Sequence, residues 1–407
     1  MKATLWTKNF TILTLGTVVS ALGGAAMSVA LSLVVFDNTA STLLTGVFSA
    51  LSLLPAAVLP ILLAPALDSR PRLPVIVGLD ACDGLLYLAF GALILLRGFS
   101  YPAYLAFGLL TGAIGGVYST AYQALYPTLI ADGFLQKGYS VSAVIYPTAT
   151  VVMAPVAAIV YRRFGIHTLF FAEGALLLIA SAFESRIRAP ERCAPRTRFS
   201  ARAYLAELAG GFRYLRGEKG IRSLYAYMAL TNAVSNGGNM MTMSYFQTSP
   251  LLTTAMYSLL ISAETLGRML GGIVHYVLRI PRTRRFPLTV SVYLAYEAMD
   301  GLLLFFPYWG MLANRFLCGF LGVNSATLRE TAVQRHLPDE MRARVSSLLS
   351  VAVTAGVLLV QVLAGALGEV LPYRAVSVLL ALCGLLGVFV FVVRRRAAIR
   401  ALMEEHE

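Results

Sequence analysis

Charged side chains inside long apolar runs are the residues of this 407-residue sequence best suited to chemistry. A charge in an apolar environment is costly unless it is paired or neutralised by a proton. Such groups are therefore candidates for binding a polar ligand or for carrying a proton. The acids are Asp80, Asp83, Glu173, Glu264, Glu297 and Asp300, and the bases counted with them are Arg268 and Arg315.

Glu264 and Arg268 lie four residues apart, so on a helix they would share one face and could form an ion pair. Two interpretations stay open. The pair could be structural, with each charge neutralising the other. Alternatively, an anionic or polar ligand competes for Arg268 and frees Glu264 to take a proton.

Two pairs of carboxyl groups are spaced three residues apart, Asp80 with Asp83 and Glu297 with Asp300. Close carboxylates in a low-dielectric environment rarely ionise together, so such a pair tends to keep a proton. Glu297, Asp300 and, less strongly, Asp83 are therefore candidates for proton coupling beside Glu264. For Asp80, pairing with arginines of the neighbouring loop is the simpler interpretation.

Uncharged polar and aromatic side chains recur at helical spacing in two other apolar runs. They are Tyr118, Tyr122, Gln123, Asn232, Asn236 and Asn239. Aromatic faces and amides together suit a large amphipathic ligand of variable shape. The alternative is ordinary packing between helices, which is our interpretation of the neighbouring methionines.

The composition requires lipid around most of the chain. Hydrophobic residues make up 58% of the sequence and charged residues only 13%, with mean hydropathy +0.73. A soluble protein has about 25% charged residues. The net charge of +13 is concentrated in loops that alternate along the chain, which is typical of membrane topology and not of nucleic-acid binding. The four cysteines and four histidines show no metal-binding or disulfide spacing.

Crossing the hydrocarbon core takes about 20 helical residues, and twelve apolar runs qualify. These runs cover residues 10–36, 43–67, 73–96, 101–130, 141–161, 166–183, 224–246, 251–278, 286–306, 309–333, 345–371 and 375–393. The first run is too long for the core of a cleaved signal peptide. The predicted fold class is an all-α membrane protein of twelve transmembrane helices.

The lysines and arginines predict the orientation of these spans. Of the 33 basic residues, only Arg97, Arg162, Arg163 and Arg374 fall in loops on one side, and almost all of the others fall on the opposite side. Basic loops remain in the cytoplasm. The sequence therefore predicts cytoplasmic N- and C-termini in a bacterial inner membrane.

The two halves of the chain resemble each other. Asp83-Gly84-Leu85-Leu86 in the third run recurs as Asp300-Gly301-Leu302-Leu303 in the ninth. This favours a six-plus-six duplication. The predicted parts are a six-helix bundle at 1–188, a cytoplasmic linker at 189–222, a second six-helix bundle at 223–395 and a tail at 396–407.

The linker is predicted to contain an amphipathic helix. Leu205, Leu208, Phe212 and Leu215 follow helical spacing, with basic residues beside them and Ser200 as an N-cap. Such a helix would lie on the inner membrane surface and contact membrane lipids.

Twelve spans, two repeats and a basic central loop resemble the major facilitator superfamily over the whole chain. That family carries roughly G-x-x-x-D-R-x-G-R after its second helix. Here Asp68 and Arg72 match the Asp and the last Arg, while both glycines and the first Arg are missing. The resemblance implies that Asp68 and Arg72 form a conformational latch; a capped helix end is the alternative.

Two segments, GGFRYLRGEKGIRSL and LPDEMRARVSSLL, resemble the branch that contains macrolide-efflux and enterobactin-exporter proteins. Ala154-Pro155 begins a weak match to the family's antiporter motif, and the Arg of many proton-coupled drug exporters is missing from the fourth run. The resemblance also implies that the first, fourth, seventh and tenth helices line the substrate path. This would place Asn314 and Arg315 in it; alternatively, Arg315 pairs with an acid across the path.

We therefore predict a secondary active transporter, not an enzyme, that works by alternating access without a cofactor or bound metal. It would act as a monomer and export a small amphipathic organic molecule, with protons as the coupling ion. The alternatives are a lipid or lysolipid translocator, an importer of organic anions that uses Arg268 and Arg315, and a membrane sensor or scaffold without transport activity. Substrate identity and coupling stoichiometry do not follow from the sequence.

Overall fold

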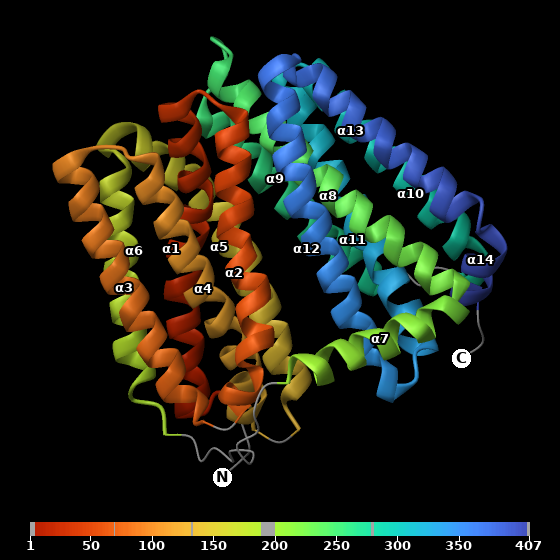
Figure 1. Cartoon of the computed structure of the whole chain (residues 1–407), viewed down its shortest axis with the longest axis horizontal. Helices are drawn as coiled ribbons and strands as arrows, with labels where there is room; N and C mark the ends of the chain where they lie inside the picture. The colour runs from red at the N-terminus through yellow and green to blue at the C-terminus, as the bar shows by residue number, and fades with distance from the viewer. Residues whose placement is uncertain (1–4, 69, 132, 189–199, 278–280, 405–407) are drawn as a thin grey trace. The chain divides into compact units, whose positions relative to one another are not determined.

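The computed structural model describes residues 5–68, 70–131, 133–188, 200–277 and 281–404. Throughout these ranges the ordered elements are helices (Figure 1). Each predicted apolar run coincides with one long helix, so the predicted fold class is confirmed.

The helices of the first half are α1 (Lys8–Thr39), α2 (Thr42–Asp68), α3 (Arg72–Arg97), α4 (Tyr101–Leu125), α5 (Leu135–Phe164) and α6 (Ile166–Glu184). Those of the second half are α7 (Ala201–Gly217), α8 (Lys219–Thr248), α9 (Thr254–Val277), α10 (Arg282–Leu302), α11 (Tyr308–His336), α12 (Asp339–Val370), α13 (Tyr373–Gly387) and α14 (Arg396–Glu404). Short 3₁₀ turns extend α4 and α10, and a π-helical turn, Val388–Val393, extends α13.

Glycine and proline mark several helix boundaries. Gly98 and Gly165 follow the last residues of α3 and α5 with φ of 74° and 82°, positive values that glycine adopts without strain. Pro307, Pro338 and Pro372 each directly precede the first residue of a helix. Proline fits there because the first amide of a helix needs no partner within it.

Nine of the described helices are long and apolar enough to cross a membrane. The predicted spans in α8, α9 and α11 fall short of that apolarity because they contain the asparagines, the Glu264–Arg268 pair and Arg315. These three helices supply most of the polar site described below.

The contacts divide the chain into two compact units. The N-terminal unit comprises Met1–Ala40, Leu51–Phe199 and Thr254–Ser262. The C-terminal unit comprises Ser41–Ala50, Ser200–Thr253 and Ala263–Glu407. Helices α2 and α9 each contribute their first residues to one unit and the remainder to the other. The predicted boundaries at 188 and 222 remain predictions.

The helix packing of one unit recurs in the other. In the N-terminal unit α1 packs on α5 and α6, and α3 packs on α4 and α6. In the C-terminal unit α8 packs on α12 and α13, and α10 packs on α11 and α13. Since α8 to α13 follow the order of α1 to α6, the predicted pseudo-symmetry is confirmed.

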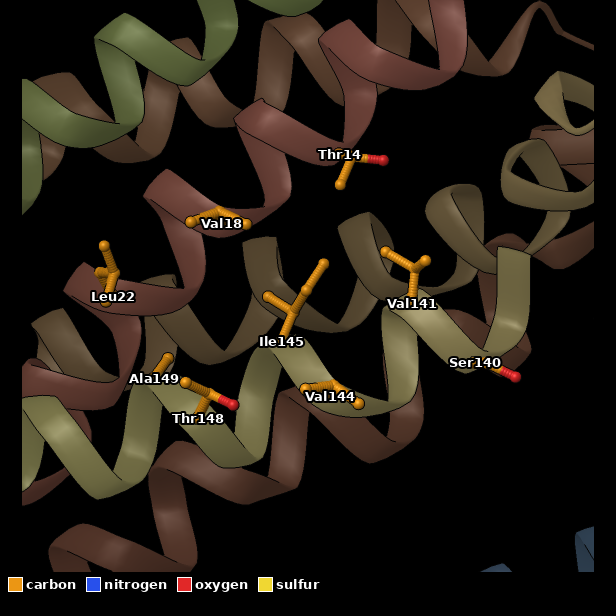
Figure 2. Close-up of a pocket in the computed structure, with 9 residues that line it drawn as sticks. All are labelled: Thr14, Val18, Leu22, Ser140, Val141, Val144, Ile145, Thr148 and Ala149. Carbon is orange, nitrogen blue, oxygen red and sulfur yellow. The ribbon is translucent and has the colours of Figure 1, made fainter. Parts of the chain in front are cut away.

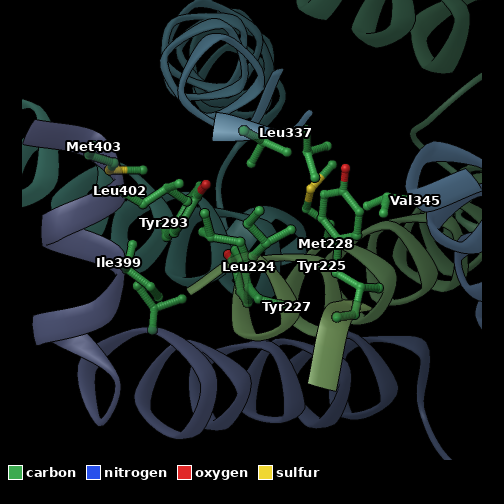
Figure 3. Close-up of a cluster of buried hydrophobic side chains, with 14 of the residues drawn as sticks. Leu224, Tyr225, Tyr227, Met228, Tyr293, Leu337, Val345, Ile399, Leu402 and Met403 are labelled. Atoms are coloured by element: carbon green, nitrogen blue, oxygen red, sulfur yellow. The ribbon is translucent and has the colours of Figure 1, made fainter. Parts of the chain in front are cut away.

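The linker helix α7 forms where the sequence predicts it, but one of its stripe residues is buried in protein. Leu215 is 7% exposed and belongs to a core cluster with Leu224, Tyr227 and residues of α10, α12 and α14 (Figure 3). The reason is that α7 packs against α12 and α8, so part of its apolar face has a protein partner. Phe212 on the same helix is 53% exposed. The side chains of Leu205 and Leu208 lie outside the described part of the chain.

Candidate substrate and proton site

A polar cavity of about 560 Å³ lies within the C-terminal unit, against α8, α9, α10 and α11. Its volume is within the range of small-molecule sites. Four predicted substrate-binding residues, Asn232, Asn236, Asn239 and Arg268, line it. Residues that the sequence analysis did not select also line it, namely Tyr227, Thr231, Ser235, Tyr293, Tyr296, Cys318, Ser325 and Arg329.

The asparagines face the cavity because they recur along one side of α8. The amide nitrogens of Asn232 and Asn236 donate to the carbonyls of Met228 and Asn232, at 2.8 and 2.9 Å. These bonds satisfy one donor of each amide within the helix. The amide oxygens and the second N–H of each group stay available to a ligand.

A second row on α8 places hydroxyl groups between the cavity and the buried acids of α10. Thr231 donates to Glu297 at 2.7 Å, and the Tyr227 hydroxyl donates to the same carboxylate oxygen at 3.1 Å. Ser235 donates to Asp300 at 3.3 Å. The four-residue spacing of these hydroxyls was visible in the sequence, but their partners on α10 were not.

Arg315 of α11 joins two of the predicted proton-coupling acids. Its Nη1 lies 2.6 Å from Asp300 Oδ1 and 3.7 Å from Glu264 Oε2. Glu264 also forms an ion pair with Arg268, one turn along α9, as the spacing predicts. The result is a chain of alternating charge from Arg268 through Glu264 and Arg315 to Asp300.

The two ends of this charge chain differ in access. The Arg268 side chain is 59% exposed and lines the cavity, whereas the side chains of Arg315 and Asp300 are 4% and 7% exposed. Asn314 is also buried and donates to the Met299 carbonyl at 2.9 Å. The structure thus places Arg315 and Asn314 behind the cavity wall, because both are held by α10.

Glycines bring α9 and α11 close enough for these charges to meet. A Cβ at Gly319 would lie 2.0 Å from the Glu264 carbonyl oxygen, and one at Gly267 would lie 2.0 Å from the Phe316 carbonyl oxygen. The two helix backbones are therefore in direct contact on the same turns that carry Glu264 and Arg315. Small residues permit this approach in membrane helices.

Comparison with known proteins assigns the fold to a family. The sequence model of the Major Facilitator Superfamily matches residues 13–299 of the chain. The chain belongs to the major facilitator superfamily. Its members are transporters and not enzymes, so the chain is a multi-pass membrane transporter.

Macrolide efflux protein A of Streptococcus pyogenes is 22% identical over 380 residues, which cover 89% of this chain and 91% of that protein. Among solved structures, the nucleoside transporter NupG matches with TM-score 0.71 at 12% identity over 98% of this chain and all of NupG. A bacterial homologue of the iron transporter ferroportin, in an inward-facing state, matches with TM-score 0.67 at 18% identity, over 95% of this chain and 98% of that chain. At these identities the two structures show the fold alone.

The other predicted substrate residues of this transporter lie in its N-terminal unit. Tyr122 shares a hydrogen bond of 2.8 Å with the Thr17 hydroxyl, and Tyr118 stacks on Tyr122. Gln123 is exposed and donates to Ser119 at 3.1 Å. Since these residues belong to the other unit, their part in substrate binding remains a prediction.

The N-terminal unit of the transporter also contains an apolar pocket of about 540 Å³ between α1 and α5 (Figure 2). Val18 and Leu22 of α1 face Val141, Val144 and Ile145 of α5. Thr14, Ser140 and Thr148 add the hydroxyl groups of an otherwise apolar surface.

Among the described residues, no arginine pairs with the buried acids of the N-terminal unit, in contrast to the C-terminal unit. Asp80, Glu173 and Glu184 are each at most 4% exposed, and oxygens of all three, and of Asp83, have no hydrogen-bond partner among the described residues. Glu184 was missed by the sequence analysis because it closes α6, just beyond the predicted apolar run. Asp83 thus remains a proton-coupling prediction that no described cation supports.

The proposed latch falls at a helix boundary. Asp68 is the last residue of α2 and Arg72 is the first of α3. The Asp68 side chain lies outside the described part of the transporter, so the latch remains a prediction.

Arg329 was not among the residues selected from the sequence, although the predicted run 309–333 includes it. In the structure it lies in α11 and lines the cavity. The final turns of α11 are polar, so the apolar pattern did not indicate that this arginine faces an interior space.

Proposed function

We propose that this transporter exports a small amphipathic organic molecule in exchange for protons, with Glu264 as the residue that takes the proton. The observation that carries the proposal is the position of Glu264 between two guanidiniums, one fixed in the protein and one exposed to a polar cavity. The name of the relative, Macrolide efflux protein A, supports the outward direction.

The exchange follows from competition for Arg268. In the structure Arg268 neutralises Glu264, and Arg315 is held mainly by the shorter contact to Asp300. A polar group of the substrate that binds Arg268 withdraws this neutralising charge. A proton that binds Glu264 breaks the same ion pair from the other side. Either ligand alone therefore opens the pair, so the carrier would move with substrate in one direction and with the proton in the other.

We place the transporter in a bacterial inner membrane with both termini in the cytoplasm, as a monomer. The distribution of basic residues supports this orientation, and the bacterial relative supports the membrane.

Proteoliposomes with an imposed proton gradient test the proposal. The probes are a radiolabelled macrolide, a catecholate siderophore and lysophosphatidylcholine, with an enclosed pH dye to record proton movement. We expect uphill movement of one probe together with proton flux, and loss of both in Glu264→Gln. Glu218→Gln is the control because Glu218 lies outside the cavity, where it contacts His336.

Three outcomes would contradict the proposal. Retained uphill transport in Glu264→Gln would eliminate this residue as the proton carrier. Substrate movement without protons would indicate a facilitator. Binding of a probe without any flux would indicate a sensor.

A further inference from the structure

The charges that face the polar cavity are both positive. Arg268 and Arg329 line it, and none of the described residues that line it is an acid. The nearby acids lie behind the wall with partners of their own: Glu264 bonds Arg268, Asp300 bonds Arg315, and Glu297 accepts hydrogen bonds from hydroxyls of α8. An approaching ligand therefore meets guanidinium groups first.

Arg329 is the cation of this wall that no described acid neutralises. Its Nη1 donates to the Tyr293 hydroxyl at 3.2 Å, and its Nε is buried without a hydrogen-bond partner. A guanidinium has five N–H donors in a planar fork that matches a carboxylate or phosphate. A partly buried guanidinium with one phenol as its partner is left with unused donors and an uncompensated charge.

The rest of the cavity fits the organic part of such an anion. Asn232 and Asn236 offer amide groups with unused hydrogen-bonding capacity. Tyr296, Val292 and Val323 supply aromatic and apolar surface. An amphipathic molecule with one anionic group would satisfy the cations and contact both kinds of surface.

We propose that the substrate of this site is an amphipathic organic anion, bound through Arg329 and, in competition with Glu264, through Arg268. This inference rests on the proposed function, in which the cavity is the substrate site. It assigns the two guanidiniums different roles. Arg329 anchors the anion, and Arg268 couples its arrival to Glu264. A free carboxylic acid and a lipid with an anionic head group present the same chemistry to these residues.

Equilibrium binding to the full-length transporter in an uncharged detergent tests this inference without any gradient. The probes are fluorescein and rhodamine 123, which share a xanthene skeleton but carry opposite charge, and the readout is fluorescence polarisation at pH 7.4. We expect saturable fluorescein binding at least tenfold tighter than rhodamine 123 binding. Arg329→Gln should weaken fluorescein binding roughly ten- to hundredfold, the usual loss for one charge-assisted hydrogen bond, and should leave rhodamine 123 binding unchanged.

Arg374→Gln is the matched control. Arg374 lies in the same unit and also donates to a tyrosine hydroxyl, that of Tyr245 at 2.7 Å, but it does not line the cavity. Its substitution should leave both affinities unchanged. Arg329→Lys keeps the charge without the fork and should give an intermediate affinity, which separates a lost anchor from a misfolded protein.

Competition identifies the source of the anion. Displacement of fluorescein by lysophosphatidylglycerol and not by lysophosphatidylcholine or indole-3-acetate would indicate a lipid head group. Displacement by indole-3-acetate and not by its methyl ester would indicate a soluble acid. Either result supports the inference.

The inference is overturned if rhodamine 123 binds as tightly as fluorescein, if neither dye binds, or if Arg329→Gln leaves fluorescein affinity intact. Its failure is distinct from failure of the proposed function. A site that prefers cations can still exchange them for protons through Glu264. Conversely, the site can bind anions selectively while the Glu264→Gln variant retains uphill transport. That result would refute the coupling role of Glu264 and leave the inferred anion selectivity intact.

Discussion

The contact between α9 and α11 gives a sharp prediction about the charge chain. In Gly319→Ala the new methyl group would lie 2.0 Å from the Glu264 carbonyl oxygen and 3.0 Å from the Arg268 amide nitrogen. Cβ atoms essentially never approach a heavy atom within 3.0 Å. The obstructing atoms are backbone, which cannot turn aside as a side chain does. The two helices must therefore separate locally by about 1 Å or more.

Overpacking of this kind costs roughly 1–3 kcal/mol, while alanine in place of a helical glycine gains up to about 1 kcal/mol of helix propensity. Gly272→Ala on α9 isolates the second effect because nothing lies within 4 Å of its Cβ position. We expect Gly319→Ala to have a lower apparent melting temperature in detergent than Gly272→Ala, which should equal or exceed the unmodified protein.

A functional readout accompanies this stability measurement. The Arg315–Glu264 separation is already 3.7 Å, so a shift of this size removes that contact. Proton-coupled transport by Gly319→Ala should fall even at temperatures where the protein remains folded. Equal melting temperatures and equal coupling in the two alanine variants would refute our account of how the glycines position these charges.

Two further predictions concern the buried acids. Glu297→Gln keeps an oxygen that accepts the hydrogen bonds from Thr231 and Tyr227, so the free energy of unfolding should change by less than about 1 kcal/mol. Glu297→Ala leaves both hydroxyls unpaired and should cost about 1–3 kcal/mol. Similar melting temperatures for the two variants would contradict this. Arg315→Gln leaves Asp300 buried without its counter-charge and should destabilise the protein by roughly 3–5 kcal/mol. Adding Asp300→Asn should recover much of this loss. If the two substitutions instead destabilise additively, the pair is not coupled.

The sequence was sufficient to predict the helices and the contacts within a single helix. Long apolar runs have few stable structures in lipid other than helices, because every backbone group must be bonded within the segment. The Glu264–Arg268 pair follows from helical geometry alone. The asparagines of α8 were selected because amides and aromatic faces together suit an amphipathic ligand, and Asn232, Asn236 and Asn239 do line the cavity.

Contacts between helices could not be predicted from the sequence, because they depend on which helix faces meet in the fold. The spacing of Glu297 and Asp300 suggested a carboxylate pair that shares a proton. In the structure Glu297 is bonded by hydroxyls of α8 and Asp300 by Arg315 of α11, so each acid has separate partners. The fact that Arg315 reaches both Asp300 and Glu264 follows from the glycine contact between α9 and α11, which no pattern within one helix encodes.

Sequence differences between the two repeats explain why, among the described residues, the charge chain lies in one unit. A Cβ at Gly112 of α4 would lie 2.0 Å from the Ser52 carbonyl oxygen of α2, just as one at Gly319 would lie 2.0 Å from that of Glu264. The two repeats thus share the same close helix contact. At the equivalent positions the N-terminal unit has Ser52 in place of Glu264 and Gly108 in place of Arg315.

This difference distinguishes the helix contacts that both repeats share from the charged residues that only the second repeat carries at these positions. The shared glycine contacts hold a pair of helices together in either unit, so they are a property of the repeat and do not by themselves indicate a site. The acid on the third helix of each repeat is also shared, as Asp83 and Asp300. An arginine partner is found only for Asp300 among the described residues. Because a binding and coupling site needs a charge that a ligand can displace, the contrast favours the C-terminal unit as the place where substrate and proton compete.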